Sequence, residues 1–419
     1  MGAQPALQGS GDADIVIGIL SYNDAETIGP VIGAAQHGLS RFFPDVRAVI
    51  VNADGGSRDG TAEAARAAAT DPGSFLQISY PVYPVHRIAD NYPGVPGKGN
   101  ALRAVFEVAE KIGARACAVV QSDVRSMTPE WTEALLRPVF DSEADYVSPL
   151  HQRHKYEATV LSGIVYPLVR ALYGKRVREP IGADFAFSPR LMRHYLREPL
   201  SETEAGSAVS DVWIATQAMT NGFNLAEARL GPRIQAPRDP APELSGILAV
   251  VLGALFTEVS RTAAVWQRTR GSASVKVFGP DLPPPIEPPP VDAAPMIEAF
   301  RLGYRNLEEI WKAVLPPATL VELKRMAARG ADSFRMPDAV WARIVYDFVL
   351  AHRSRVMDRD HLLRALTPLY LGWLASYVLQ VRDVSAVEAE QRIDALCIAY
   401  ETQKAYLISR WRWPDRFNP

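Results

Sequence analysis

Residues 15–24 read Ile-Val-Ile-Gly-Ile-Leu-Ser-Tyr-Asn-Asp, an apolar and mostly β-branched run that ends in polar turn residues. A run of this kind predicts a short buried strand. The pattern recurs along the first half of the chain, separated by stretches with apolar residues at helical spacing. The predicted strands are residues 15–20, 46–51, 116–120 and 146–150, with a weaker one at 75–85; the predicted helices are 27–43, 61 onward, 99–112 and 129 onward. Strands that alternate with helices indicate a mostly parallel α/β sheet.

The second half of the chain has a different pattern. Residues 243–270 and 293–412 are mostly helical, and a proline-rich segment at 282–290 predicts a stiff, extended linker. The sequence therefore predicts four segments. They are a flexible N-terminus (1–13), an α/β domain (14–270), a linker (271–292) and a helical C-terminal domain (293–419).

Composition and charge narrow the class of protein. The chain has 419 residues, of which 48% are hydrophobic and 22% charged, as in an ordinary globular protein. Its 45 basic and 47 acidic side chains give a net charge of −2, which argues against a nucleic-acid partner. With only two cysteines, Cys117 and Cys397, a disulfide scaffold and a cysteine-rich zinc site are excluded. We expect both to be buried free thiols in a reducing compartment.

No targeting or membrane-spanning segment is expected. Residues 1–14 lack the basic and apolar regions of a signal peptide. The most apolar later stretch, residues 246–255, is soon interrupted by Glu258 and Arg261, and a membrane span needs about 20 apolar residues. We therefore expect a soluble, cytoplasmic protein.

Polar clusters follow three of the predicted strands. They are residues 21–24, 52–59 and 121–123. Ligands of parallel sheets bind beyond the carboxyl ends of the strands, so these clusters are expected to line one rim.

Each candidate motif has a structural alternative. Residues 94–100, Gly-Val-Pro-Gly-Lys-Gly-Asn, could hold a phosphate at a helix N-terminus, or form a plain turn. Asp54 could accept hydrogen bonds from a base or ribose, or close a tight turn. Asp123 could hold a divalent cation against a diphosphate, or make strand-end hydrogen bonds. Asp211 is either an active-site carboxylate or, slightly favoured by composition, a helix N-cap.

A basic cluster follows the strand at 146–150. It comprises His151, Arg153, His154, Lys155 and Tyr156. These side chains could hold an anionic substrate through charge-assisted hydrogen bonds, or form a solvated loop.

Taken in order, these segments resemble GT-A fold nucleotide-sugar glycosyltransferases of the family 2 type. Residues 19–24 resemble their opening strand, 52–61 their Asp-Gly-Ser-x-Asp-Gly-Thr turn, and 97–102 their Gly-Lys-Gly-x-Ala stretch, while 121–123 stand where their Asp-x-Asp metal motif falls. Residues 166–174 and 180–185, with the helical C-terminal half, are most similar to the mannosylglycerate synthases and glucosyl-3-phosphoglycerate synthases. Those enzymes pass a hexose to glycerate or its phosphate with retention of configuration.

The resemblance implies a role for each matching residue. Ser21, Tyr22, Asn23, Asp54, Lys98, Asn100, Gln121 and Ser122 would bind the donor, Asp123 and Gln235 would ligate Mg²⁺ or Mn²⁺, and Arg153, Lys155 and Tyr156 would face the acceptor. Asp184 would face the donor sugar and Asp211 would lie near the reacting centre.

The chain departs from the family pattern at two positions of the expected metal site. Gln121 replaces the first acid, and Gln235 replaces a histidine that follows a Leu-Gly-Pro stretch in relatives. Three interpretations stay open. The metal is held mainly by Asp123 and the donor phosphates, a cation such as Arg233 replaces it, or catalysis is lost.

The sequence thus predicts a hexosyltransferase that moves glucose or mannose from a nucleotide-diphosphate sugar to a small anionic acceptor such as glycerate or phosphoglycerate. The alternative is a catalytically degenerate sugar-nucleotide-binding or scaffold protein. A phosphate-binding NTPase would rest on residues 94–98 alone, and the Ser or Thr of a Walker loop is missing there. The C-terminal helices could cover the active site or form a homo-oligomer interface.

Overall fold

The computed structural model describes residues 13–82, 95–198, 207–235, 243–283 and 285–413. By their internal contacts these residues form two compact units. Unit 1 comprises Met1–Gln152, Glu179–Pro242 and Val275–Pro283; unit 2 comprises Arg153–Arg178, Glu243–Ser274 and Pro284–Pro419. Residues 153–178 and 243–274 therefore group with the C-terminal helices, whereas the sequence placed 153–178 and 243–270 in the α/β domain and 271–274 in the linker.

Unit 1 is built on an eight-stranded sheet with the order β10-β8-β5-β7-β4-β1-β2-β3. All neighbouring strands are parallel except at β7, which is antiparallel to both β4 and β5. The strands are β1 (Ile15–Ser21), β2 (Ala48–Asp54), β3 (Phe75–Ser79), β4 (Ala116–Gln121), β5 (Tyr146–His151), β7 (Phe185–Phe187), β8 (Leu225–Gly231) and β10 (Lys276–Phe278). The predicted mostly parallel α/β fold is confirmed.

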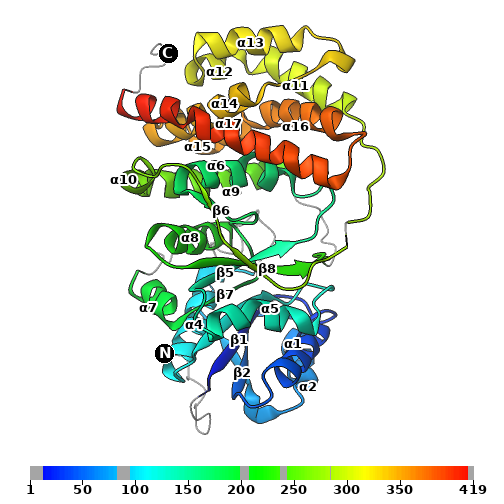
Figure 1. The fold of residues 1–419 in the computed structure, drawn as a ribbon, viewed down its shortest axis with the longest axis vertical. Coiled ribbons are helices and arrows are strands. Elements are labelled where there is room, and N and C mark those ends of the chain that lie inside the picture. The colour runs from blue at the N-terminus through cyan, green and yellow to red at the C-terminus, as the bar shows by residue number, and fades with distance from the viewer. Residues whose placement is uncertain (1–12, 83–94, 199–206, 236–242, 284, 414–419) are drawn as a thin grey trace. The chain divides into compact units, whose positions relative to one another are not determined.

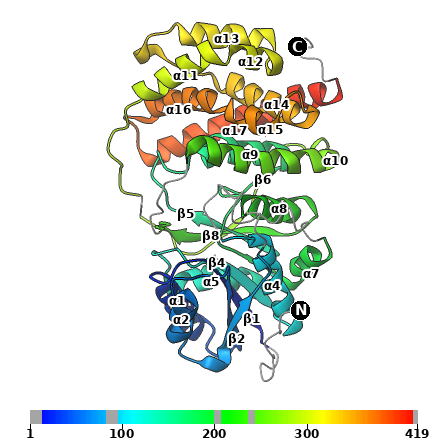
Figure 2. The same cartoon turned by 180° about the vertical axis from the view of Figure 1, so that it is seen from behind.

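Helices cover both faces of this sheet. They are α1 (Ile28–Phe42), α2 (Thr61–Ala68), α4 (Lys98–Lys111), α5 (Pro129–Phe140), α7 (Pro189–Arg197) and α8 (Ser207–Thr220). Because side chains alternate along a strand, Ile15, Ile17 and Ile19 share a core with α1 and α5, which lie side by side (Figure 1). Val16 and Leu20 share the opposite core with α4, α7 and α8. These three helices are labelled in Figure 2, which shows the molecule from behind.

The segment predicted as a linker contributes to the sheet. Residues 276–278 form β10, which pairs with β8, and Ala273–Ser274 form β9, which pairs in unit 2 with β6 (Lys175–Arg176). The linker prediction for residues 271–292 was therefore wrong at its start, because residues 273–274 and 276–278 pair with β6 and β8.

Unit 2 is mainly helical, as predicted for the C-terminal region. Its helices are the π-helical turn η2 (Leu161–Val165), α6 (Tyr166–Tyr173), α9 (Leu244–Arg261), α10 (Ala263–Trp266), α11 (Ala294–Asn306), α12 (Glu308–Val314), α13 (Pro317–Ala327), α14 (Asp338–Ser354), α15 (Arg359–Arg364), α16 (Thr367–Val381) and α17 (Ala386–Arg412). The long helix α17 packs along α14 and α6 (Figure 1). Trp341 and Trp373 stack with ring centroids 5.9 Å apart. Of the five C-terminal tryptophans, only Trp413 is exposed.

Two stretches of unit 2 are long and apolar enough to cross a membrane. They are Leu244–Arg261 and Arg359–Val381, of which 50% and 67% are buried inside the structure. Core helices of folded units have the same properties, so the finding is weak evidence for a membrane span. Cys117 and Cys397 are buried free thiols, as predicted.

Gly18 allows α4 to pack directly on β1. A Cβ at this position would lie 2.6 Å from Cγ1 of Val105. We expect Gly18→Ala to destabilise the protein by about 1–3 kcal/mol, because the core must shift to admit the methyl group. Val105→Ala in the same molecule removes the clash and should restore much of the loss. Urea unfolding measures both effects.

Gly33→Ala provides the control, because nothing lies within 4 Å of a Cβ there. It should leave stability unchanged or slightly higher. A Gly18→Ala variant as stable as Gly33→Ala would contradict the close packing.

His352 makes stability depend on pH. It lies buried in α14 against Phe256, and burial, with Arg359 and Arg355 adding to it, lowers its pKa to about 4. The unfolded chain takes up a proton near pH 6.5, so this contribution is complete above pH 6.5 and is lost as the pH falls towards 4, by up to about 3 kcal/mol.

We expect His352→Gln to reduce the loss of stability between pH 7 and pH 4, as measured by urea unfolding at each pH. His361→Gln, at an exposed position in the same unit, should retain the full loss. An unchanged pH profile in His352→Gln would contradict the role of this side chain.

Candidate functional site

The central strands end level with one another at one edge of the sheet. Ser21 pairs with Asp54 across β1 and β2, and Leu20 pairs with Gln121 across β1 and β4. The chain leaves β1 towards β2 on one side, whereas β4 lies on the other. In such sheets ligands bind at this change of direction, in the crevice beyond the carboxyl ends of the strands. The three polar clusters found in the sequence meet there.

The loops that follow β1 and β2 are tied together by side chains. The Asn23 backbone N–H donates to Oγ of Ser57 over 2.9 Å, and the Arg58 N–H donates to Oδ1 of Asn23 over 3.0 Å. Asn23 holds a left-handed backbone with φ of 56°, which asparagine tolerates better than most residues. The Asp24 N–H donates to Oγ1 of Thr61 over 2.8 Å. The two loops therefore form one rigid rim.

Asp54 holds the turn after β2. Its carboxylate accepts the N–H groups of Gly56 and Ser57, each over 2.8 Å, and the hydroxyls of Ser57 and Ser21 over 2.6 and 3.2 Å. Two carboxylate oxygens have about four acceptor positions, so these bonds occupy them. The geometry matches the tight-turn interpretation of Asp54. Its predicted contact with a nucleoside stays a prediction.

The loop before α4 lies against this turn. A Cβ on Gly55 would lie 2.9 Å from the Tyr80 hydroxyl and 3.2 Å from Tyr22, so only glycine fits without a shift. The Tyr80 hydroxyl donates to the Pro96 carbonyl over 2.9 Å, and Nδ2 of Asn100 donates to the Pro81 carbonyl over 2.9 Å. Tyr22, Asp54 and Asn100, all predicted donor residues, thus belong to one local assembly. Gly94, the start of the predicted phosphate loop, lies outside the described residues.

Lys98 and Asp211 form a buried ion pair. Lys98 is the first residue of α4, and its Nζ lies 2.6 Å from Oδ1 of Asp211, with the two side chains 3% and 8% exposed. Asp211 lies past the first turn of α8, so the N-cap interpretation was wrong. Burial raises the pKa of Asp211, Lys98 opposes this effect, Asp184 adds to it, and Arg233 opposes it. The pKa of Asp211 thus depends on the charges of Lys98 and Arg233, two cations of unit 1.

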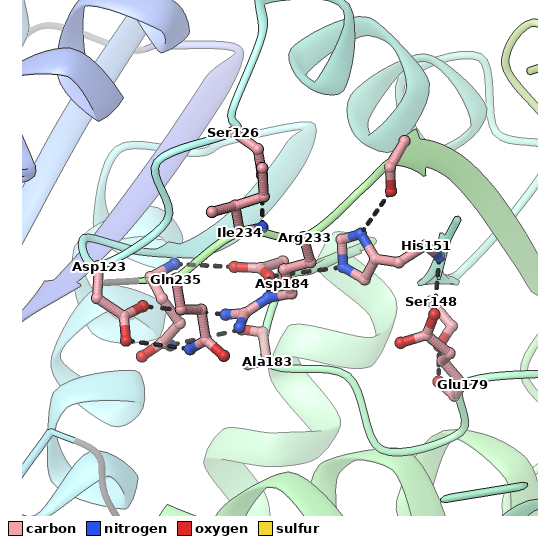
Figure 3. A network of polar contacts seen from close by, with 12 residues as sticks. Asp123, Ser126, Ser148, His151, Glu179, Ala183, Asp184, Arg233, Ile234 and Gln235 are labelled. Atoms are coloured by element: carbon pink, nitrogen blue, oxygen red, sulfur yellow. Dashed lines mark hydrogen bonds and ion pairs between the residues drawn. The ribbon is translucent and has the colours of Figure 1, made fainter. Parts of the chain in front are cut away.

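Arg233 and Asp184 form a second buried ion pair, drawn in Figure 3. Nε of Arg233 donates to Oδ2 of Asp184 over 2.8 Å, and the backbone N–H of Gln121 donates to Oδ1 over 2.9 Å. Burial alone would raise the pKa of Asp184, but Arg233, His151 and these hydrogen bonds lower it. Asp184 is therefore an ionised carboxylate with no exposed surface.

The reversed strand β7 explains how Asp184 reaches this edge. Because β7 runs antiparallel, the residues before Phe185 lie at the same edge as the carboxyl ends of β4 and β5. Phe185 pairs with Val119, which brings Asp184 beside Gln121. Arg233 comes from the loop after β8, which lies next to β5.

The loops after β4 and β8 run side by side. Val124 bridges Gln235 in antiparallel fashion, the Arg125 N–H donates to the Ile234 carbonyl over 2.8 Å, and the Ile234 N–H donates to Oγ of Ser126 over 2.9 Å. This pairing brings together Asp123 and Gln235, the two predicted metal ligands. Nε2 of Gln235 donates to Oδ2 of Asp123 over 3.1 Å (Figure 3).

Asp123 also faces Arg233. Nη2 of Arg233 lies 4.0 Å from Oδ1 of Asp123. Burial would lower the pKa of Arg233, but Asp184 and Asp123 hold it above its usual value, with Glu179 adding to the effect. The guanidinium therefore lies as a fixed positive charge between two aspartates.

These residues do not fit a resident divalent cation. Within the described parts of the chain, no group of three or more histidine, cysteine, aspartate or glutamate side chains could hold a metal. A metal needs acceptor oxygens around it. Here an amide N–H and a guanidinium face Asp123 instead. The predicted ligands lie together, but their arrangement is that of a hydrogen-bonded ion-pair cluster.

The remaining predicted donor residue after β4 is fully buried. Ser122 donates through Oγ to the Leu20 carbonyl over 2.9 Å and also bonds Asp24, so it ties β4 to the loop after β1. Gln121 contributes its backbone N–H to Asp184, while its side-chain amide lies 3.5 Å from the Ala183 carbonyl.

The basic cluster after β5 is divided between the two units. In unit 1, His151 is buried, its backbone N–H donates to Glu179 over 2.7 Å, and its Nε2 lies 3.9 Å from Asp184. Glu179 has no sequence signal that would mark it, because its role depends on a chain segment far from β5. His151 belongs to the site and not to a solvated loop.

The predicted acceptor residues lie in unit 2. Nζ of Lys155 donates to the carbonyls of Val384 and Arg382 over 2.8 and 3.3 Å, and its side chain is 6% exposed. Arg153 lies 3.2 Å from Glu157. The Tyr156 ring lies beneath Lys155 at 5.6 Å. Lys155 is thus a buried structural cation in unit 2, and the acceptor roles of these residues stay predictions.

Comparison with known proteins gives similarity in structure only. No protein-family model and no curated protein sequence matches the chain. A glucosyl-3-phosphoglycerate synthase from Mycobacterium tuberculosis, solved with phosphoglyceric acid, is 20% identical, with a TM-score of 0.43 over 60% of this chain and 80% of that one. The same enzyme solved with Mn²⁺, UDP-glucose and phosphoglyceric acid has a TM-score of 0.42 at 20% identity, with the same coverage.

A mannosyl-3-phosphoglycerate synthase from Rubrobacter xylanophilus is 19% identical, with a TM-score of 0.45 over 65% of this chain and 79% of that one. We base the function proposed below on the geometry of the site.

Arg233→Met should destabilise the protein by about 3–5 kcal/mol, because it leaves Asp184 and Asp123 buried without their cation. Arg229→Met is the matched control from the same segment. Arg229 pairs with Asp281, which is 94% exposed, so its loss should cost at most about 1 kcal/mol. Urea unfolding compares the two, and equal losses would contradict the buried pair.

Proposed function

We propose that this chain is a hexosyltransferase that takes glucose or mannose from a nucleotide-diphosphate sugar and passes it, with retention, to a small anionic acceptor such as glycerate or phosphoglycerate. The observation that carries the proposal is a pair of buried cations at the carboxyl edge of the sheet, each held by a buried aspartate. Lys98 pairs with Asp211, and Arg233 pairs with Asp184. Such cations at the carboxyl edge of an α/β sheet suit a diphosphate.

The two cations of the site would bind the diphosphate, and Asp184 would hold one of them in place. Lys98, at the first turn of α4, adds its ammonium to the positive end of a helix, a combination that favours phosphate oxygens. Arg233 presents a planar guanidinium, and both cations would stabilise charge that develops on a departing diphosphate. Asp184 fixes the direction of the guanidinium through its 2.8 Å hydrogen bond.

The rim formed by the loops after β1 and β2 would hold the nucleoside. Tyr22 lies against Gly55 there, and its ring provides an apolar surface for a base. The proposed cytoplasmic location and a homo-oligomer through the C-terminal helices rest on the sequence alone.

A second candidate, a sugar-nucleotide-binding protein without catalysis, is favoured by one observation. The polar groups that should bind the donor already have partners within the protein: Asp54 holds its own turn, and Lys98 holds Asp211. Donor binding without transfer would distinguish this candidate from the enzyme.

Thermal unfolding with UDP-glucose, GDP-glucose, GDP-mannose and ADP-glucose tests both candidates. A donor at a hundred times its dissociation constant should stabilise the protein by about 2.7 kcal/mol through mass action. The stabilising donor is then incubated with glycerate and with 3-phosphoglycerate, and the product is identified by mass spectrometry. Transfer supports the enzyme, and binding without transfer supports the second candidate.

Lys98→Met should abolish the stabilisation by the donor. Lys111→Met, at the exposed end of the same helix, should retain it. If none of the donors stabilises the protein, both candidates are contradicted.

A further inference from the structure

Arg233 has hydrogen-bonding capacity that the protein does not use. Its side chain is 9% exposed, and its Nε is bonded to Asp184. Its Nη2 is buried, yet it donates no hydrogen bond to any residue that the structure describes, and it lies 4.0 Å from Oδ1 of Asp123. A buried guanidinium donor without an acceptor is costly, so a folded protein that keeps one needs a reason, and a ligand that supplies the acceptor is such a reason.

The side chains around Arg233 suit the guanidinium itself and leave little negative charge for a further cation. Gln235 points its amide N–H, and not its oxygen, at Asp123. Gln121 binds Asp184 through its backbone N–H and brings no negative charge. Of the two Asp123 oxygens, Oδ2 accepts the Gln235 amide N–H and Oδ1 lies 4.0 Å from the Arg233 guanidinium. A second positive charge beside Asp123 would be repelled by the guanidinium.

We propose that Arg233 takes the place of the divalent cation, so that the site binds the diphosphate of its donor without metal. This inference rests on the proposed function and names the group that neutralises the donor. A guanidinium matches two phosphate oxygens with parallel N–H groups, so it can hold a diphosphate in one orientation. Asp184 holds the guanidinium through its hydrogen bond with Nε, and the diphosphate would accept the hydrogen bond of Nη2.

The arrangement has a consequence for the metal dependence of donor binding. A metal dissociates and is removed by a chelator, whereas Arg233 is part of the chain and stays protonated at any pH at which the protein is folded. Donor binding should therefore be independent of divalent metal.

The test uses the full chain and the diphosphates UDP, GDP and ADP, with uridine, guanosine and adenosine as ligands that lack the diphosphate. Calorimetric titrations are made in EDTA and in excess Mn²⁺, and Mn²⁺ bound to the protein is measured separately by electron paramagnetic resonance. We expect one diphosphate to bind with the same affinity in both conditions, within about twofold. We expect no protein-bound Mn²⁺, with or without that nucleotide.

Variants assign this binding to the guanidinium. Arg233→Lys keeps the charge and the ion pair but loses the planar fork, and we expect affinity for the diphosphate to fall about tenfold. Asp184→Asn combined with Arg233→Met removes both charges, so neither is left buried alone, and it should weaken the diphosphate by about tenfold to a hundredfold. Both should leave nucleoside affinity unchanged. Arg229→Met is the control and should change neither affinity.

The outcomes separate the inference from the proposed function. Diphosphate binding that requires Mn²⁺, or Mn²⁺ bound together with the nucleotide, overturns the inference and leaves the proposed function standing. Metal-free binding that is unchanged in both Arg233 variants also overturns it. If no diphosphate binds in either condition, the proposed function itself fails, and the inference fails with it.

Discussion

Arg233 is a positive charge with almost no water around it, and a guanidinium in that position must be matched by the protein. Asp184, which has no exposed surface, provides the direct partner, and Asp123 lies on the other side. Removing two such charges from water costs several kcal/mol each, and their attraction repays this only when the geometry is good and further hydrogen bonds are made. The backbone N–H of Gln121 supplies one of these bonds. The arrangement of the loops at this edge of the sheet depends on this cluster, because its members come from the ends of three different strands.

The fold delivers these groups to one place through a single irregularity in the sheet. A purely parallel sheet would present only segments that follow strands. The reversed strand β7 adds a segment that precedes one, and Asp184 lies in it. The antiparallel bridge between Val124 and Gln235 then holds the loops after β4 and β8 together. The charged side chains are thus carried by loops whose backbone is itself hydrogen-bonded, which is the condition for precise placement of charge.

Periodicity was enough to predict the alternating strands and helices of residues 15–151, because buried strands and amphipathic helices leave strong local patterns. It could not predict β7 or β10, whose three residues each are too short to show a period. Local patterns also misplaced Asp211, since the helix that contains it begins earlier. At the site, strand-end position identified Asp123, and the glycine-rich segment before a helix identified Lys98. The contacts of Arg233, His151 and Glu179 join segments 28 or more residues apart, and no local signal encodes them. Gln121 and Gln235 indicated that the expected metal site is altered, but they did not decide between the three interpretations of that change.

The central claim is that the chain's own guanidinium provides the charge that a metal provides elsewhere. The most direct measurement is a crystal structure of the protein grown with its nucleoside diphosphate and Mn²⁺, with anomalous scattering recorded at the manganese edge. The account predicts diphosphate oxygens within hydrogen-bond distance of Nη2 of Arg233, and no anomalous peak beside Asp123. A manganese peak between Asp123 and the diphosphate, with Arg233 turned away, would contradict it.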